Sequence, residues 1–137
     1  MTTFHIYFDG SCKPNPNGIA SYGIYIPELN LKISKLIGKG RGMTNNLAEW
    51  TGAVNSLKII EKEAYPRDKI RLIGDSQLVI RQLSGKYNVY ARNLIPLYRE
   101  AIQIITTLKA NNVYISFEHV SRDKNRIADE LSQMAAK

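Results

Sequence analysis

The chain of 137 residues carries 19 basic and 12 acidic side chains, a formal net charge of +7, and a single cysteine. This length is typical of one domain, expected to span residues 1–137, and suffices for a hydrophobic core without disulfides or metal ions. No intrachain disulfide, signal peptide or membrane-length apolar run is found, so we expect no membrane partner and a cytoplasmic location. The positive charge favours a polyanionic partner such as nucleic acid, although an ordinary basic surface explains it equally well.

The first third of the chain shows the alternating pattern of β-strands. Residues 3–9 place Phe4, Ile6 and Phe8 on one face, and this strand is expected to end at Asp9. Two further alternating segments follow at residues 21–26 and 31–37. Three antiparallel strands in a meander are the simplest arrangement.

Beyond this meander, apolar residues recur at helical spacing. A first helix is expected to begin at a cap formed by Thr44 or Asn45 and to include Trp50 in the core. A short apolar strand follows at residues 70–74. Asp75 or Ser76 then opens a second helix.

The last part of the chain contains a polar loop, a helix, a strand and a closing helix. Their expected ranges are residues 84–92, 94–108, 113–120 and 125–136. Ile127, Leu131 and Met134 are expected to face inward from the closing helix. The order β-β-β-α-β-α-α-β-α predicts an α/β fold with a five-stranded mixed sheet flanked by helices, because strand–helix–strand crossovers require parallel pairing.

Four acidic residues fall near the ends of predicted elements, namely Asp9, Glu49, Asp75 and Asp129. Each has an ordinary alternative: a turn residue, a solvated helix glutamate, a helix cap and a partner of a helix dipole, respectively. If the strands carrying Asp9 and Asp75 are neighbours, however, two bare carboxylates would lie side by side and repel each other.

A bound divalent cation would remove this repulsion. Carboxylates without a histidine or thiolate cluster favour Mg²⁺ or Mn²⁺ over zinc. In a basic protein, such an acidic site suggests phosphoryl transfer on nucleic acid, in which two ions about 4 Å apart activate water and stabilise the leaving oxygen.

Four motifs closely resemble type 1 ribonuclease H, in order and in spacing. They are residues 9–18, 44–49, 74–77 and 125–129, and the resemblance spans residues 4–136. It implies a ribonuclease H fold and an endonuclease that hydrolyses the RNA strand of RNA–DNA hybrids, leaving 3′-hydroxyl and 5′-phosphate ends. The implied partner is the hybrid, and no obligate protein partner is evident.

The resemblance also implies catalytic roles for the four carboxylates. Asp9, Glu49, Asp75 and Asp129 match ligands of two Mg²⁺ ions, for which Mn²⁺ can substitute. Asp9 would bridge both ions, Asp129 would complete the ion that activates water, and Glu49 and Asp75 would hold the ion at the leaving group. Glu49 would also lie near the 2′-hydroxyl that distinguishes RNA from DNA.

Substrate binding is implied for five further positions, Gly10, Asn15, Thr44, Asn45 and Gln77. Gly10 would let the backbone approach the metals and phosphate closely. Thr44 would bind a phosphate of the DNA strand, and helix capping is the alternative for Thr44 and Asn45.

The chain departs from many relatives in the loop before the last helix, where residues 121–124 contain no histidine. Arg122 is the first candidate to replace it, and His119, two residues before the loop, is the second. The polar loop at residues 84–92 is too short for a basic protrusion. Its Lys86, Arg92, Tyr87 and Tyr90 would bind the DNA strand by charge and stacking, or they belong to an ordinary polar loop.

Other enzymes share this fold, and fold alone does not separate them. One alternative is a non-catalytic module that binds RNA–DNA hybrids, although such a module would be expected to lack a carboxylate. Another is a domain of a reverse transcriptase. The sequence leaves open the choice between Mg²⁺ and Mn²⁺, activity on double-stranded RNA or on single ribonucleotides in DNA, the oligomeric state and the physiological role.

Overall fold

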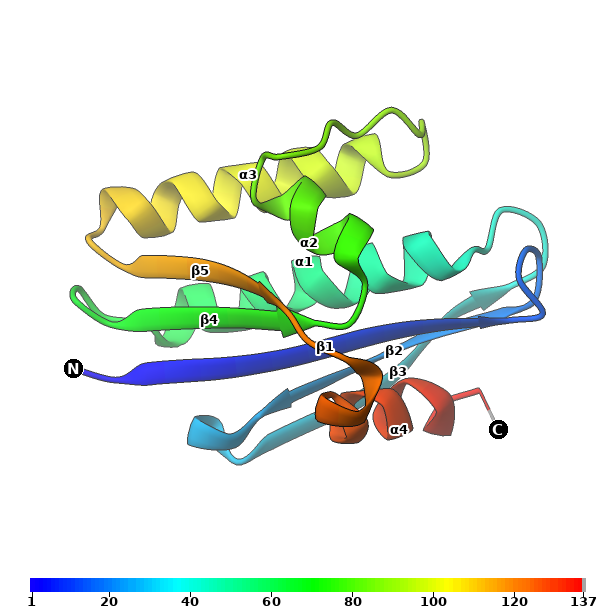
Figure 1. The fold of residues 1–137 in the computed structure, drawn as a ribbon, viewed down its shortest axis with the longest axis horizontal. Helices are drawn as coiled ribbons and strands as arrows, with labels where there is room; N and C mark the ends of the chain where they lie inside the picture. The colour runs from blue at the N-terminus through cyan, green and yellow to red at the C-terminus, as the bar shows by residue number, and fades with distance from the viewer. Residues whose placement is uncertain (137) are drawn as a thin grey trace.

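Five strands form one mixed sheet in the computed structural model, which describes residues 1–136 (Figure 1). Lys137, the last residue of the predicted domain, lies outside the described residues. The elements are β1 (Thr3–Lys13), β2 (Ile19–Ile26), β3 (Leu31–Lys39), α1 (Asn45–Glu63), β4 (Lys69–Gly74), α2 (Gln77–Leu83), α3 (Ile95–Ala110), β5 (Tyr114–His119) and α4 (Arg126–Met134). Two short 3₁₀ helices are added, η1 (Pro27–Leu29) and η2 (Arg122–Lys124). The predicted order of elements is confirmed.

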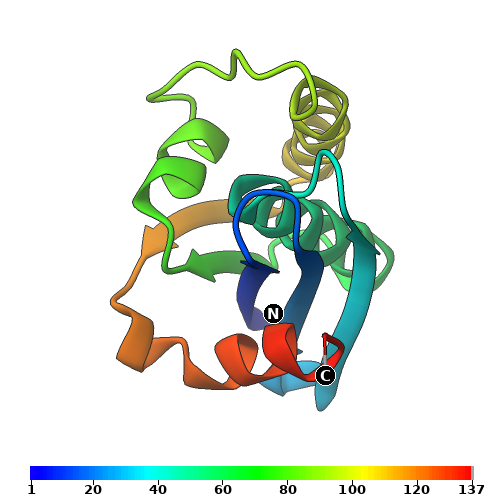
Figure 2. The ribbon, with the colours of Figure 1, turned by 90° about the vertical axis from the view of Figure 1, so that its right-hand side faces the viewer.

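The strands lie in the order β3-β2-β1-β4-β5. β1, β2 and β3 pair antiparallel, whereas β4 pairs parallel with both β1 and β5. The predicted mixed sheet is therefore confirmed. Helices α1, α2 and α3 lie on one face of the sheet and α4 lies on the other (Figures 1 and 2).

The hydrophobic core lies between the sheet and α1. The predicted inward face of β1, formed by Phe4, Ile6 and Phe8, is buried there. Trp50 is fully buried, as predicted, and its indole nitrogen donates to Gln82 Oε1 at 3.0 Å. Thr44 begins α1 as the N-cap, because its hydroxyl accepts from the backbone N–H of Leu47 at 3.1 Å.

Strand β1 is longer than predicted. It continues past Asp9 to Lys13, and Asp9 lies in mid-strand opposite Gly23. The expected end at Asp9 is wrong because residues 10–13, whose composition is typical of turns, pair with the first half of β2. This cross-strand pairing outweighs their weak local strand preference.

Helix α4 is rotated relative to the prediction. Its buried residues are Ala128, Leu131 and Ser132, whereas Ile127 is 38% and Met134 59% exposed. The inward placement of Leu131 is confirmed, and that of Ile127 and Met134 is wrong. Small residues let the helix lie close to the sheet, which favours this face. Among residues 1–136, none of the helices combines the length and apolar character that crossing a membrane requires.

Candidate active site

The four predicted carboxylates line one pocket of about 180 Å³. Asp9 lies within β1, and Asp75 directly follows β4, the parallel neighbour of β1. Glu49 is in the first turns of α1, and Asp129 is in the first turn of α4. The sheet thus supplies two carboxylates, and one helix on each face supplies another.

Three of these residues form a tight group of oxygen ligands. Asp9, Glu49 and Asp75 each offer a carboxylate oxygen, and these atoms lie within 4.8 Å of one another. Asp75 Oδ2 is buried and has no hydrogen-bond partner. Ser76, rather than Asp75, caps α2 by accepting from the N–H of Val79 at 3.3 Å, so Asp75 is not needed as a cap. A buried carboxylate oxygen without a partner, in a cluster of oxygen ligands, fits a divalent cation of the Mg²⁺ type.

The electrostatics of the pocket favour binding of positive charge. Burial, followed by the negative charge of Asp75, raises the pKa of Asp9 to about 8. Burial and the charge of Asp75 also raise the pKa of Glu49 to about 7, although the Ser76 hydroxyl and Arg122 act in the opposite direction. The repulsion predicted between Asp9 and Asp75 is therefore present, and a divalent cation would relieve it.

Two glycines allow α1 and α4 to approach the strands that carry the site. A Cβ atom on Gly10 would lie 2.2 Å from the backbone nitrogen of Glu49. A Cβ atom on Gly23 would lie 2.4 Å from the carbonyl oxygen of Ala128. Gly10 therefore has a packing role, because a side chain there would displace the helix that carries Glu49. The contact of Gly10 with substrate stays a prediction.

Asn15 and Asn45 connect the β1–β2 turn to the start of α1. Asn15 Oδ1 accepts from the backbone N–H of Asn45 at 3.0 Å, and Asn45 Oδ1 accepts from the N–H of Cys12 at 2.8 Å. These bonds use the carbonyl oxygens and leave the side-chain NH₂ groups for other partners. Asn45 lines the carboxylate pocket, and Thr44 precedes it as the cap of α1.

The remaining predicted residues divide between two places. Arg122 lines the carboxylate pocket, where its positive charge partly opposes the rise in the pKa of Glu49 that burial and Asp75 cause. Gln77 and His119 line a different pocket of about 350 Å³, together with residues of α2 and β5. Of the two candidates for the missing loop histidine, Arg122 is the one beside the carboxylates.

The sequence interpretation missed two residues of α4 that contact the carboxylates. Ser132 Oγ donates to Asp9 Oδ2 at 3.1 Å, and Gln133 Nε2 donates to Asp129 Oδ1 at 3.1 Å. Their spacing from Asp129, three and four residues, puts them on the same helix face. That spacing could have indicated Gln133 as a neighbour of Asp129, whereas the contact of Ser132 with Asp9 depends on how α4 is rotated against the sheet.

Comparisons with known proteins agree with this geometry. The model of a family described as reverse transcriptase-like matches residues 7–135. Ribonuclease HI of Halobacterium salinarum is 33% identical over 132 residues, which cover 96% of this chain and 63% of that protein. A bifunctional protein of Mycobacterium tuberculosis is 30% identical over 132 residues, or 93% of this chain. This chain spans about a third of the mycobacterial relatives' length (34%).

Two solved structures show the same fold. One is the N-terminal RNase H domain of a Mycobacterium tuberculosis protein, solved as a fusion with maltose-binding protein. It matches with a TM-score of 0.83 and 27% identity, and the match covers 99% of this chain and 100% of that one. LC11-RNase H1, solved in complex with an RNA/DNA hybrid, has a TM-score of 0.75 and 28% identity and covers 93% of this chain and 92% of that one. The resemblance found in the sequence is thereby confirmed: the chain belongs to the reverse transcriptase-like family and has the ribonuclease H fold.

Proposed function

We propose that the protein is an endonuclease that hydrolyses the RNA strand of RNA–DNA hybrids and leaves 3′-hydroxyl and 5′-phosphate ends. The observation that carries this proposal is the group of oxygen atoms from Asp9, Glu49 and Asp75 within 4.8 Å of one another, with Asp129 in the same pocket. Relatives named ribonuclease HI and RNase H1, one of them in complex with a hybrid, support it.

The carboxylates would hold two divalent cations, which we propose to be Mg²⁺ with Mn²⁺ as a substitute. When bound, the cations would supply positive charge that activates water and stabilises the leaving oxygen. Asp9 is held in place by Ser132, and Asp129 is held by Gln133. Arg122 would contact a phosphate oxygen or the departing product, since it lines the pocket and its guanidinium offers several donors.

Recognition of the hybrid would use the residues around the start of α1. The free NH₂ groups of Asn15 and Asn45 would donate to nucleotides in the shallow groove. Thr44 would bind a phosphate of the DNA strand while also capping the helix, and Gln77 would contact the groove from α2. Gly10 would keep the backbone close to the scissile phosphate. The cytoplasmic location expected from the sequence stays a prediction.

Cleavage of a labelled hybrid, with Mg²⁺ and with a chelator, tests the proposal. We expect metal-dependent cleavage of the RNA strand only, with single-stranded RNA and duplex DNA left intact. Asp75→Asn should lower the rate by at least about 100-fold, because it removes a ligand aimed at the cation. Glu61→Gln is the control, since Glu61 is an exposed residue of α1 that does not line the carboxylate pocket, and it should cleave at the normal rate.

Two results would contradict the proposal in different ways. Full cleavage by Asp75→Asn would separate the activity from this pocket. Tight binding of the hybrid without cleavage, in both Mg²⁺ and Mn²⁺, would make the protein a binding module of the same fold.

A further inference from the structure

A second cavity, of about 340 Å³, lies between the sheet and the beginning of α4. Tyr7, Tyr25 and Pro27 line it from the sheet side, and residues 123–128 line it from the other side. It shares no lining residue with the carboxylate pocket. The two are nevertheless adjacent, because Tyr7 precedes Asp9 by two residues and side chains two apart on a strand share a face.

The floor of this cavity is aromatic. Tyr7 and Tyr25 are directly opposite each other on β1 and β2, and their rings stack with centroids 5.9 Å apart and planes inclined by 27°. Both rings are only partly buried, so they have area left for another flat group. Lys32 Nζ lies 5.7 Å from the centroid of the Tyr25 ring and brings a positive charge to this floor.

The opposite wall offers donors for an anion. Lys124 and Arg126 are exposed there, and neither forms an ion pair within the part of the chain that the structure describes. Asn125, the N-cap of α4, makes no side-chain cap bond, so the first N–H groups of the helix have no capping acceptor. The one carboxylate on this wall, Asp123, accepts from the hydroxyl of Ser121 at 2.5 Å.

Asn125 joins the two walls of the cavity. It is 1% exposed, and its Nδ2 donates to the carbonyl oxygen of Phe8 at 2.9 Å. Because that contact holds the amide in one orientation, the acceptor Oδ1 is identified, and Oδ1 is buried without a partner. The bond to Phe8 ties the start of α4 to β1, the strand that carries Tyr7, so the two walls of the cavity are held together.

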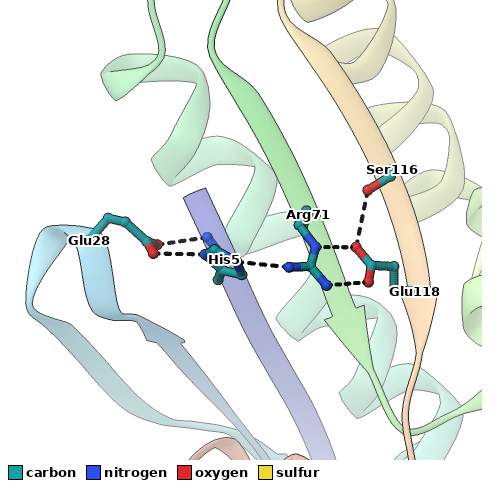
Figure 3. A network of polar contacts seen from close by, with 5 residues as sticks. All are labelled: His5, Glu28, Arg71, Ser116 and Glu118. Atoms are coloured by element: carbon teal, nitrogen blue, oxygen red, sulfur yellow. Dashed lines mark hydrogen bonds and ion pairs between the residues drawn. The ribbon is translucent and has the colours of Figure 1, made fainter. Parts of the chain in front are cut away.

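The carboxylates farther along this face already have hydrogen-bond partners (Figure 3). Glu28 accepts from the backbone N–H and the ring Nδ1 of His5, at 2.7 and 2.8 Å. Glu118 forms two bonds of 2.6 Å with the guanidinium of Arg71. These paired carboxylates oppose an incoming phosphate less than free ones would.

We propose that this cavity binds one unpaired nucleotide of a single-stranded overhang, while the hybrid from which the overhang extends is bound at the carboxylate pocket. Its base would stack on Tyr25 and Tyr7, and its phosphate would lie at the start of α4 with Lys124 and Arg126. The volume is in the range of small-ligand sites. The first turn of α4 carries Asp129 into the carboxylate pocket and Arg126 to this cavity. A strand that leaves the carboxylate pocket would therefore reach this cavity. The inference rests on the proposed function for the identity of the strand.

Fluorescence anisotropy of labelled hybrids tests the inference. All variants carry Asp75→Asn, so that no cleavage occurs, and each binds a blunt hybrid and the same hybrid with a four-nucleotide DNA overhang at either end. We expect one of the overhangs to tighten binding by about 5- to 100-fold, the range of stacking one base on an aromatic ring. Tyr25→Leu and, separately, Arg126→Gln should remove most of this gain without changing the affinity for the blunt hybrid.

Tyr114→Leu is the matched control, because Tyr114 is a 65% exposed tyrosine of β5 outside this cavity, and it should keep the gain. Arg126 is exposed, so its variant tests the idea even if Tyr25→Leu misfolds. An overhang that adds no affinity, or a gain that survives both variants, overturns the inference. If free AMP binds in a way that depends on Tyr25 while the overhang has no effect, the inference is also overturned, because the cavity then binds a free nucleotide and not a strand. Because binding is measured without cleavage, an inactive wild-type enzyme would contradict the proposed function and not this site.

Discussion

The carboxylate of Asp9 is buried in β1, and its pKa of about 8 lies well above the ordinary value of 3.8. Without a cation, the folded protein therefore binds a proton between these values that the unfolded chain has released. Stability follows the difference in bound protons, so it falls as the pH rises from about 4 to about 8. Glu49, with its pKa raised to about 7, adds to this loss over the same window.

Asp9→Asn should therefore stabilise the metal-free protein at pH 8. The amide keeps the shape of the side chain and removes the buried charge, so we expect the melting temperature to rise by a few degrees at pH 8 and to change little near pH 4. Mn²⁺ or Mg²⁺ should raise the melting temperature of the wild type and have much less effect on the variant. Equal destabilisation at both pH values would instead show that the bond from Ser132 to Asp9 dominates.

Single residues of the candidate site were predicted from the sequence where they belong to recognisable motifs. All four carboxylates were predicted because their motifs resemble one family in order and spacing, and Arg122 was preferred to His119 for its position in the loop. Ser132 was not found, because its role depends on the rotation of α4 about its own axis. That rotation is decided by contacts with Gly23, which lies in β2, far from α4 in the sequence.

Each of the two helices that bring a carboxylate to the site depends on a glycine below it. Gly23 lies beneath α4, in contact with Ala128, Leu131 and Ser132. Because a Cβ atom there would meet backbone atoms, which cannot rotate away, the whole helix would have to shift. Asp129 would move with it, and Ser132 would lose its contact with Asp9.

Gly23→Ala should thus lower both stability and activity. We expect a loss of about 1–3 kcal/mol in the free energy of unfolding, the usual cost of overpacking, and a fall in cleavage larger than the loss of folded protein explains. Gly38→Ala is the control, because a Cβ atom on Gly38 would meet only Met43 side-chain atoms, at 3.6 Å or more. Chemical denaturation and cleavage assays on both variants separate the two effects. Similar behaviour of the two would show that α4 adapts without cost.

Helices and strands whose apolar residues recur at a regular spacing were predicted best. The helical spacing around Trp50 and the alternation around Ile24 both reflect burial against the sheet or helix opposite. The second half of β1 was missed because residues 10–13 have no such pattern. They are held as a strand by pairing with β2 and by the close approach of α1 at Gly10, which are long-range contacts.

Across the whole molecule, one polar network joins three strands and η1 on the face opposite α1 (Figure 3). It runs from Glu28 through His5 and Arg71 to Glu118, and Arg71 Nη1 donates to His5 Nε2 at 2.8 Å. The hydrogen bonds from Arg71 lower the pKa of Glu118 below its ordinary value of 4.5. The contribution of the ionised Glu118 to stability is therefore fully present above pH 4.5, and it is lost as the pH falls through the lowered pKa.

Glu118→Gln should lower stability at pH 7 by no more than about 1 kcal/mol, since the pair with Arg71 is partly exposed and solvent screens it. The difference from the wild type should shrink as the pH falls below 4.5 through the lowered pKa of Glu118, because the carboxyl then takes up a proton and loses its charge. Glu61→Gln, an exposed helix glutamate without an ion pair among residues 1–136, is the comparison and should show neither effect. Denaturant midpoints across this pH range are the measurement, and a pH-independent difference would argue against the ion pair.

The mixed pairing of the sheet was predicted from the meander and the strand–helix–strand crossovers, whereas the order of the strands was not predicted. The cavity at Tyr7 and Tyr25 was not predicted. It depends on how far the short helix α4 extends over the sheet, and no local pattern in the sequence records that distance.

The loop between α2 and α3 (residues 84–94) divides the four proposed catalytic carboxylates unequally (Figure 1). Asp9, Glu49 and Asp75 precede it, and Asp129 alone follows it. Under the proposed function, a polypeptide cut within this loop would give two inactive pieces, and hydrolysis would return only when they reassemble. The protein therefore has the layout of a split reporter, in which a fluorogenic hybrid would reveal when two fused partners come together inside a sample.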